Sequence, residues 1–147
     1  MSKWCDTQSE IRFTVAGVPK AKGRPRFNGK FAYTPKDTVQ FENWVRLCFV
    51  GEAGTEWKLI PKGVAISAVI CAFFPIPKSW SKKKIEQAQN SLIPCIKRPD
   101  GDNLAKSILD SLNGVAFHDD SQVTPLLVSK VYGDEPRTEV VLRWEET

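Results

Sequence analysis

The sequence contains a single histidine and four well-separated cysteines. Zinc sites are built from clustered cysteine and histidine side chains, so the chain carries no zinc motif. Cys48 and Cys71 lie in apolar stretches, where a free cysteine acts as a small core residue, and unpaired thiols are typical of a cytoplasmic protein. Ser-His-Asp catalysis is also poorly supported, because His118 is the only candidate base and no serine lies in a Gly-x-Ser-x-Gly turn.

Long hydrophobic segments are absent as well. The longest nearly apolar run, Val64 to Pro77, is shorter than the ~20 residues that cross a bilayer, and the N-terminus has no apolar signal segment. We therefore expect neither a membrane location nor secretion. No repeat or low-complexity tract divides the 147 residues, which predicts one folded domain over residues 11–147 after a loose tail at residues 1–10.

The first half of the chain predicts a strand followed by a helix. Apolar and polar residues alternate over Ile11–Val15, as in a half-buried strand. Thr34 is the expected N-cap of a helix and Pro35 its first residue. The helix then shows apolar residues at the spacing of one buried face: Phe41, Trp44, Val45 and Cys48.

The second half predicts further strands and short helices. Val64 to Phe74 is almost wholly apolar, as in a central strand covered on both faces. Residues 126–131 and 139–144 predict two strands, and the turn residues 133–136 between them predict a terminal hairpin. This irregular alternation of strands and helices indicates an α+β fold with a mixed sheet packed against helices.

The net charge is +4, and the basic residues are unevenly distributed. Residues 17–33 contain no acidic residue and five basic ones: Lys20, Lys22, Arg24, Arg26 and Lys30. Asn28-Gly29 predicts a tight hairpin in this stretch, beside the aromatic residues Phe27, Phe31 and Tyr33. Cations on a loop neutralise phosphates and aromatic rings stack on bases, so we expect this segment to bind DNA.

A second basic run, Lys82–Lys84, follows Ser81, which is the expected N-cap of a short helix. This run is equally consistent with a solvated helix face and with a DNA contact.

Residues 98–120 hold five of the 17 acidic residues: Asp100, Asp102, Asp110, Asp119 and Asp120. A helical period that begins at Asp102 places one set of residues on an apolar face: Leu104, Ala105, Ile108, Leu109 and Leu112. The opposite face is polar and consists of Asp102, Asn103, Lys106, Ser107, Asp110 and Ser111. The pattern predicts a helix that buries one side and exposes Asp102, Lys106 and Asp110 on the other.

Carboxylates at this density suit phosphodiester hydrolysis. Mg²⁺ prefers carboxylate oxygens, neutralises phosphate oxygens and activates water. Asp100 and Asp102 flank Gly101 at the helix start, and a fold-back of the chain after Gly114 would bring Asp119-Asp120 toward them. Lys106 lies one turn after Asp102, in a position to pair with it, to contact a phosphate or to stabilise a leaving oxygen. The alternative is structural: each aspartate caps a helix or forms a turn, and Lys106 is a surface residue.

These residues resemble a known family. Asp100-x-Asp102-Asn103-x-x-Lys106-x-x-x-Asp110-x-Leu112, followed by Asp119-Asp120-x-x-Val123, resembles the signature of the RusA-type Holliday junction resolvases. Lys20-x-Lys22-Gly23-Arg24-Pro25-Arg26 is similar to the basic N-terminal motif of many phage-borne members.

The resemblance implies a homodimeric, Mg²⁺-dependent endodeoxyribonuclease, with Mn²⁺ as an alternative ion. Such an enzyme nicks opposing strands of four-way DNA junctions in recombination and repair. The resemblance assigns the metal-binding carboxylates to Asp100, Asp102 and Asp120 and the catalytic lysine to Lys106. Asp119 and Asp110 match family positions with less defined roles. A dimer also suits the near two-fold symmetry of the junction.

Two other functions remain open at this point. One is a non-catalytic DNA-binding protein, in which the basic hairpin binds DNA and the aspartates are caps and turns. The other is a nuclease for other branched DNA, such as flaps.

Overall fold

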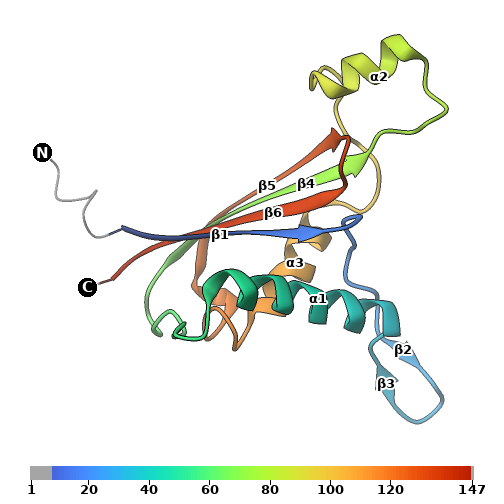
Figure 1. The fold of residues 1–147 in the computed structure, drawn as a ribbon. Helices are drawn as coiled ribbons and strands as arrows, with labels where there is room; N and C mark the ends of the chain where they lie inside the picture. Colours follow the sequence, from blue (N-terminus) through green and yellow to red (C-terminus); the bar gives the residue numbers. More distant parts are fainter. Residues whose placement is uncertain (1–7, 147) are drawn as a thin grey trace, which may run out of the picture.

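The computed structural model describes residues 8–146, which form a mixed four-stranded sheet with strand order β1-β6-β4-β5 (Figure 1). The strands are β1 (Gln8–Ala16), β4 (Ile66–Pro75), β5 (Val123–Gly133) and β6 (Arg137–Glu145). The pair β4–β5 is parallel, whereas β1–β6 and β4–β6 are antiparallel. The predicted α+β class with a mixed sheet is confirmed. Strand β1 begins three residues before the expected Ile11, and the rest of the predicted tail, residues 1–7, lies outside the described residues.

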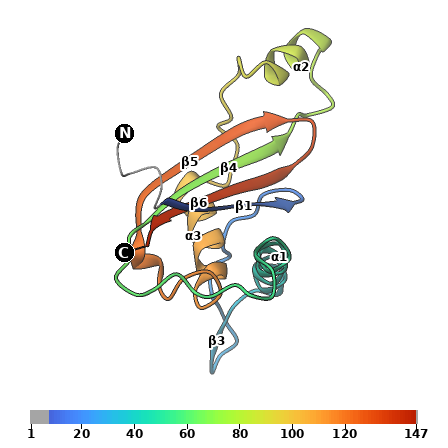
Figure 2. The ribbon, with the colours of Figure 1, turned by 60° about the vertical axis from the view of Figure 1, so that its left-hand side comes forward.

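The main helices, α1 (Lys36–Ala53) and α3 (Gly101–Leu112), lie on the same face of the sheet (Figures 1 and 2). The residues of β4 alternate between two classes. Those on one face are fully buried and join the core: Ile66, Ala68, Ile70, Ala72 and Phe74. The residues between them are only half-buried. The expectation of a strand covered on both faces was therefore wrong, because the helices pack on one side of β4 only.

The predicted terminal hairpin was also wrong. Strands β5 and β6 follow each other along the chain, but β4 lies between them and pairs with both. A central strand must satisfy backbone hydrogen bonds along both of its edges. The connection from β4 to β5 contains α3, and a helical crossover of this kind allows the parallel pairing that a tight turn does not.

Helix α1 begins at Lys36, one residue after the predicted start. Pro35 occupies the N-cap position without a side-chain cap, and its carbonyl accepts the Val39 amide at 3.2 Å. The helix ends at Ala53, and Gly54 is its C-cap with a φ of 83°, which is accessible to glycine at little cost. Its buried residues include Phe41, Val45 and Phe49.

Two smaller elements extend from opposite ends of the molecule (Figure 1). The strands β2 (Arg26–Phe27) and β3 (Ala32–Tyr33) confirm the predicted hairpin. Its loop spans residues 28–31 and is longer than the tight Asn28-Gly29 turn that the sequence predicts. Gly29 has a positive φ but Asn28 does not, so the two-residue turn is not formed. Helix α2 (Lys82–Gln89) begins as predicted, with Ser81 Oγ accepting the Lys84 amide at 3.2 Å.

Within residues 8–146, no helix is both long enough and apolar enough to cross a membrane. Cys48, Cys71 and Cys95 are free thiols, and Cys5 lies outside the described residues.

Candidate active site

Helix α3 carries the acidic stretch and buries the predicted side. Its apolar face is in the core: Leu104, Ala105, Ile108, Leu109 and Leu112. Asp102 and Lys106 are exposed on the other side. The expectation that Ser107 and Ser111 share this exposed face was wrong. Both are fully buried on the side of α3 that packs against α1, where small side chains allow the helices to approach closely, and Ser111 Oγ donates to the Ser107 carbonyl at 2.7 Å.

Asp102, Lys106 and Asp120 line one cleft between α3 and β5. The β5 wall of this active-site cleft is apolar and consists of Leu126, Leu127 and Val128. Among residues 8–146 Lys106 forms no ion pair, so the pairing with Asp102 that the spacing allows is not made. The Lys106 ammonium is therefore available to an anion that enters the cleft.

Asp120 reaches the cleft through a hydrogen-bonded turn built by its neighbours. Asp119 caps a short 3-10 helix, η1 (Asp120–Gln122), and its Oδ2 accepts the Ser121 amide at 3.1 Å. The hydrogen bonds from Ser121 lower the pKa of the Asp119 carboxyl below its ordinary value. Asp119 therefore acts as the cap of the turn, while Asp120 faces the cleft.

Gln122 completes the same turn, and the sequence analysis missed its role. Gln122 Oε1 accepts the amides of His118 and Asp119, and Gln122 Nε2 donates to the carbonyls of Pro61 and Val64 at 2.9 and 3.0 Å. These bonds attach the turn to the loop that precedes β4. The spacing Asp-x-x-Gln, which is typical of a capping box, was the available signal.

Asp100 lies beside the cleft and not in it. It occupies the N-cap position of α3, and its Oδ1 accepts a hydrogen bond from Asn103 Nδ2 at 2.5 Å. Its carboxylate lines a separate depression together with Arg98, Pro99 and Asn103. Lys130, on β5, fixes this segment by donating to the carbonyls of Lys97 and Pro99.

The donor set of the cleft suits a hard divalent cation. Within residues 8–146, no three acidic, histidine or cysteine side chains come close enough together to form a metal cage. Two carboxylates, Asp102 and Asp120, do share the cleft. Mg²⁺ is commonly held by one or two carboxylates together with substrate phosphate and water, so these two residues fit Mg²⁺.

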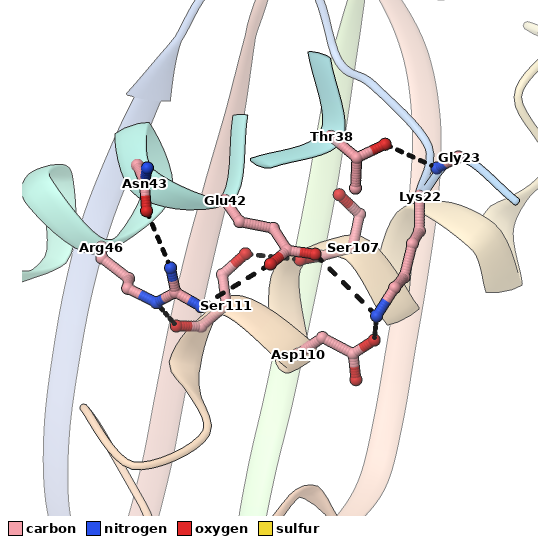
Figure 3. A network of polar contacts seen from close by, with 9 residues as sticks. All are labelled: Lys22, Gly23, Thr38, Glu42, Asn43, Arg46, Ser107, Asp110 and Ser111. Atoms are coloured by element: carbon pink, nitrogen blue, oxygen red, sulfur yellow. Dashed lines mark hydrogen bonds and ion pairs between the residues drawn. The ribbon is translucent and has the colours of Figure 1, made fainter. Parts of the chain in front are cut away.

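Asp110 is not in the active-site cleft but in a neighbouring polar network (Figure 3). Its side chain is only 19% exposed, so the expectation that Asp110 is exposed like Asp102 and Lys106 was wrong, because Lys22 covers it. Lys22 Nζ lies 2.6 Å from Asp110 Oδ2 and 3.9 Å from Glu42 Oε1. The hydrogen bond to Asp110 raises the pKa of the Lys22 ammonium above its ordinary value, and the charges of Glu42 and Asp120 add to this shift.

The other predicted DNA-binding cations are arranged differently. Lys20, Arg24 and Arg26 line a groove at the start of α1, and Arg98 contributes to the same groove. Arg98 was missed because it is far from the others in the sequence. Among the described residues, these four cations form no ion pair. Lys30 is exposed in the hairpin loop, away from this basic groove.

One short segment of the chain, residues 98–102, connects the basic groove to the active-site cleft. Arg98 and Pro99 line the groove and also the depression of Asp100, and Gly101 and Asp102 line the cleft. A cleft with two carboxylates and a lysine, connected through this segment to a groove whose four cations form no ion pair among the described residues, suits an enzyme that hydrolyses nucleic-acid phosphodiesters.

The model of the family "Endodeoxyribonuclease RusA" matches residues 16–143, so the chain belongs to the RusA family. The protein is accordingly an endodeoxyribonuclease of the kind that resolves Holliday junctions in recombination. A relative in Bacillus subtilis (strain 168), "Uncharacterized protein YqaN", is 40% identical over 139 residues, which cover 90% of this chain and 95% of the relative.

Proposed function

We propose that this protein is a Mg²⁺-dependent Holliday junction resolvase that nicks opposing strands of a four-way junction during recombination and repair. The observation that carries the proposal is the shared cleft of Asp102, Lys106 and Asp120, which residues 98–102 connect to the basic groove. Mn²⁺ is the alternative ion, because it accepts the same oxygen ligands.

Each side chain of the cleft has a distinct role in this proposal. Asp102 and Asp120 hold the cation, which, when bound, supplies charge neutralisation at the phosphate and acidifies a water molecule. Lys106 donates to a phosphate or leaving oxygen, where negative charge increases during hydrolysis. Asp100 is the third proposed ligand. Because Asp100 lines the neighbouring depression, its side chain would have to turn toward the cleft to contribute.

The basic groove and the hairpin β2–β3 form the proposed DNA surface. Lys20, Arg24, Arg26 and Arg98 in the groove contact backbone phosphates, which position the strand at the cleft. Phe27 and Phe31 are each 70% exposed on the projecting hairpin, beside Lys30. An exposed ring next to cations is suited to stack on a base that is unpaired at the junction centre.

A homodimer is part of the proposal, because a four-way junction presents two equivalent phosphates and resolution requires both to be cut. A two-fold dimer provides two identical clefts in matching orientation. We propose that the enzyme works in the cytoplasm, where bacterial and phage DNA recombine.

The test compares cleavage of a synthetic four-way junction, a flap and a linear duplex at equal concentration, with Mg²⁺ or with EDTA. We expect paired nicks in the junction only, and none in EDTA. Preferred cleavage of the flap would indicate that the protein is a nuclease for other branched DNA and not a Holliday junction resolvase. Binding without any Mg²⁺-dependent nicking would make the protein a non-catalytic DNA-binding protein and overturn the proposal.

A further inference from the structure

Lys22 differs from the other cations of its segment in its surroundings. Its side chain is 29% exposed and faces Asp110 and Glu42, whose side chains are 19% and 15% exposed. Lys20, Arg24 and Arg26, by contrast, form no ion pair among the described residues. A lysine held between two largely buried carboxylates is poorly placed to bind a DNA phosphate. Its departure would leave Asp110 without an ion-pair partner among the described residues and Glu42 with Arg46 alone, at 3.6 Å.

The contacts of Lys22 connect the basic segment that contains it to two helices, α1 and α3 (Figure 3). Asp110 belongs to α3, the helix of Asp102 and Lys106, while Glu42 belongs to α1. Glu42 Oε1 is buried and has no hydrogen-bond partner among the described residues. Lys22 Nζ lies 3.9 Å from this oxygen and Arg46 Nη2 lies 3.6 Å from Glu42 Oε2, so the two cations together balance the Glu42 carboxylate.

The residue after Lys22 fixes the backbone of the basic segment to α1. The Gly23 amide donates to Thr38 Oγ1 at 2.9 Å, and Thr38 is buried. A Cβ atom at Gly23 would lie 2.6 Å from Thr38 Oγ1, so only glycine fits this approach. Lys22 and Gly23 together therefore hold the basic segment against both α1 and α3.

We propose that Lys22 and Asp110 form a latch that positions the basic groove relative to the active-site cleft, and that neither residue contacts DNA or metal. Asp110 lies one helical turn after Lys106, so the latch holds the loop of Lys20 and Arg24 to the same rigid helix that carries the cleft. The inference rests on the proposed function, because it assigns the groove to the phosphates that flank the cut.

Two hypotheses, that Lys22 forms the latch or that it binds a DNA phosphate, predict different behaviour for the variants Lys22→Met and Asp110→Asn. The salt slope is the steepness with which the logarithm of the binding constant falls as the logarithm of the salt concentration rises. If Lys22 binds phosphate, Lys22→Met weakens junction binding and lowers the salt slope by about 0.9, whereas Asp110→Asn frees the lysine and strengthens binding. If the pair is a latch, both variants lower the single-turnover cleavage rate at saturating protein by ~10-fold or more, because a small misplacement is costly, while the salt slope stays unchanged.

Three further variants complete this experiment. Lys22→Arg keeps the charge and should restore most of the cleavage rate. The double variant Lys22→Met/Asp110→Asn should lose no more activity than either single variant, because the two residues act as one unit. Lys20→Met is the matched comparison from the groove, and it should weaken binding and lower the salt slope.

A second readout does not depend on nicking. Hydrogen exchange at the Gly23 amide should become faster in Lys22→Met and in Asp110→Asn, and should be unchanged in Lys20→Met. If the unaltered protein fails to nick junctions but shows these exchange differences, the proposed function fails while the latch stands. Unchanged exchange at Gly23 in both variants, or opposite effects of the two on DNA affinity, would overturn the latch.

Discussion

Replacement of Asp102 by asparagine should separate DNA binding from cleavage. Asp102 is exposed in the first turn of α3, so the substitution leaves the core packing intact. The charge contributes only its interaction with the helix N-terminus, which is worth about 0.3–1 kcal/mol. We therefore expect the free energy of unfolding to fall by no more than about 1 kcal/mol.

The effect on catalysis should be much larger. The cleft contains two carboxylates and one ammonium, Asp102, Asp120 and Lys106, so it carries a net charge of −1 before any cation binds. Asp102→Asn removes one of the two proposed cation ligands in the cleft. The loss of one such electrostatic contribution typically costs ~10²- to 10³-fold in rate, or about 3–4 kcal/mol of transition-state stabilisation. Without metal, binding should strengthen slightly, because a neutral cleft repels phosphate less.

The assay measures junction binding in Ca²⁺ and single-turnover nicking in Mg²⁺, with thermal unfolding measured in parallel. Asp134→Asn is the matched control, because Asp134 is exposed in the turn before β6 and accepts a hydrogen bond from Gln89 that an asparagine oxygen also accepts. It should retain nicking. Nicking that persists in both Asp102→Asn and Asp120→Asn would refute the assignment of the cleft as the metal site.

The basic groove, the Asp119 cap and the proposed dimer each give a further prediction. The double variant Arg24→Ala/Arg26→Ala should weaken binding to junction and duplex alike and lower the salt slope by ~0.9 for each phosphate that is no longer neutralised. Binding titrations at several salt concentrations measure this slope, and an unchanged slope contradicts the assignment of the groove as the DNA surface. The pKa of Asp119 is lowered in the folded state, so its contribution to stability is complete above its unfolded pKa and disappears as the pH falls through the folded pKa. Acid unfolding of Asp119→Asn should lack this part of the pH dependence. A pH profile identical to that of the unaltered protein would contradict the role of Asp119 as a cap. The protein should sediment as a dimer, and a monomer both alone and with junction DNA contradicts the two-fold arrangement.

Much of the candidate site could be predicted from local spacing. A helical period depends only on neighbours three and four residues apart, so Asp102 and Lys106 were correctly assigned to the exposed side of α3 and Leu104 and Ile108 to the core. The same reasoning was wrong for Ser107, because polarity alone did not indicate that α1 packs on that side. Similarly, counting charges predicted a basic segment at residues 17–33 but did not separate Lys22 from its neighbours.

Local sequence is sufficient for the family motif, the amphipathic helix α3 and the hairpin at Asn28-Gly29, because each depends on residues that are close together in the chain. Which distant residues meet depends on the tertiary fold. The insertion of β4 between β5 and β6, the placement of Asp120 in the same cleft as Asp102, and the Lys22–Asp110 pair across 88 residues all result from sheet pairing and helix packing. These contacts form because backbone groups and charges that folding removes from water must find partners, and a local sequence pattern does not specify those partners.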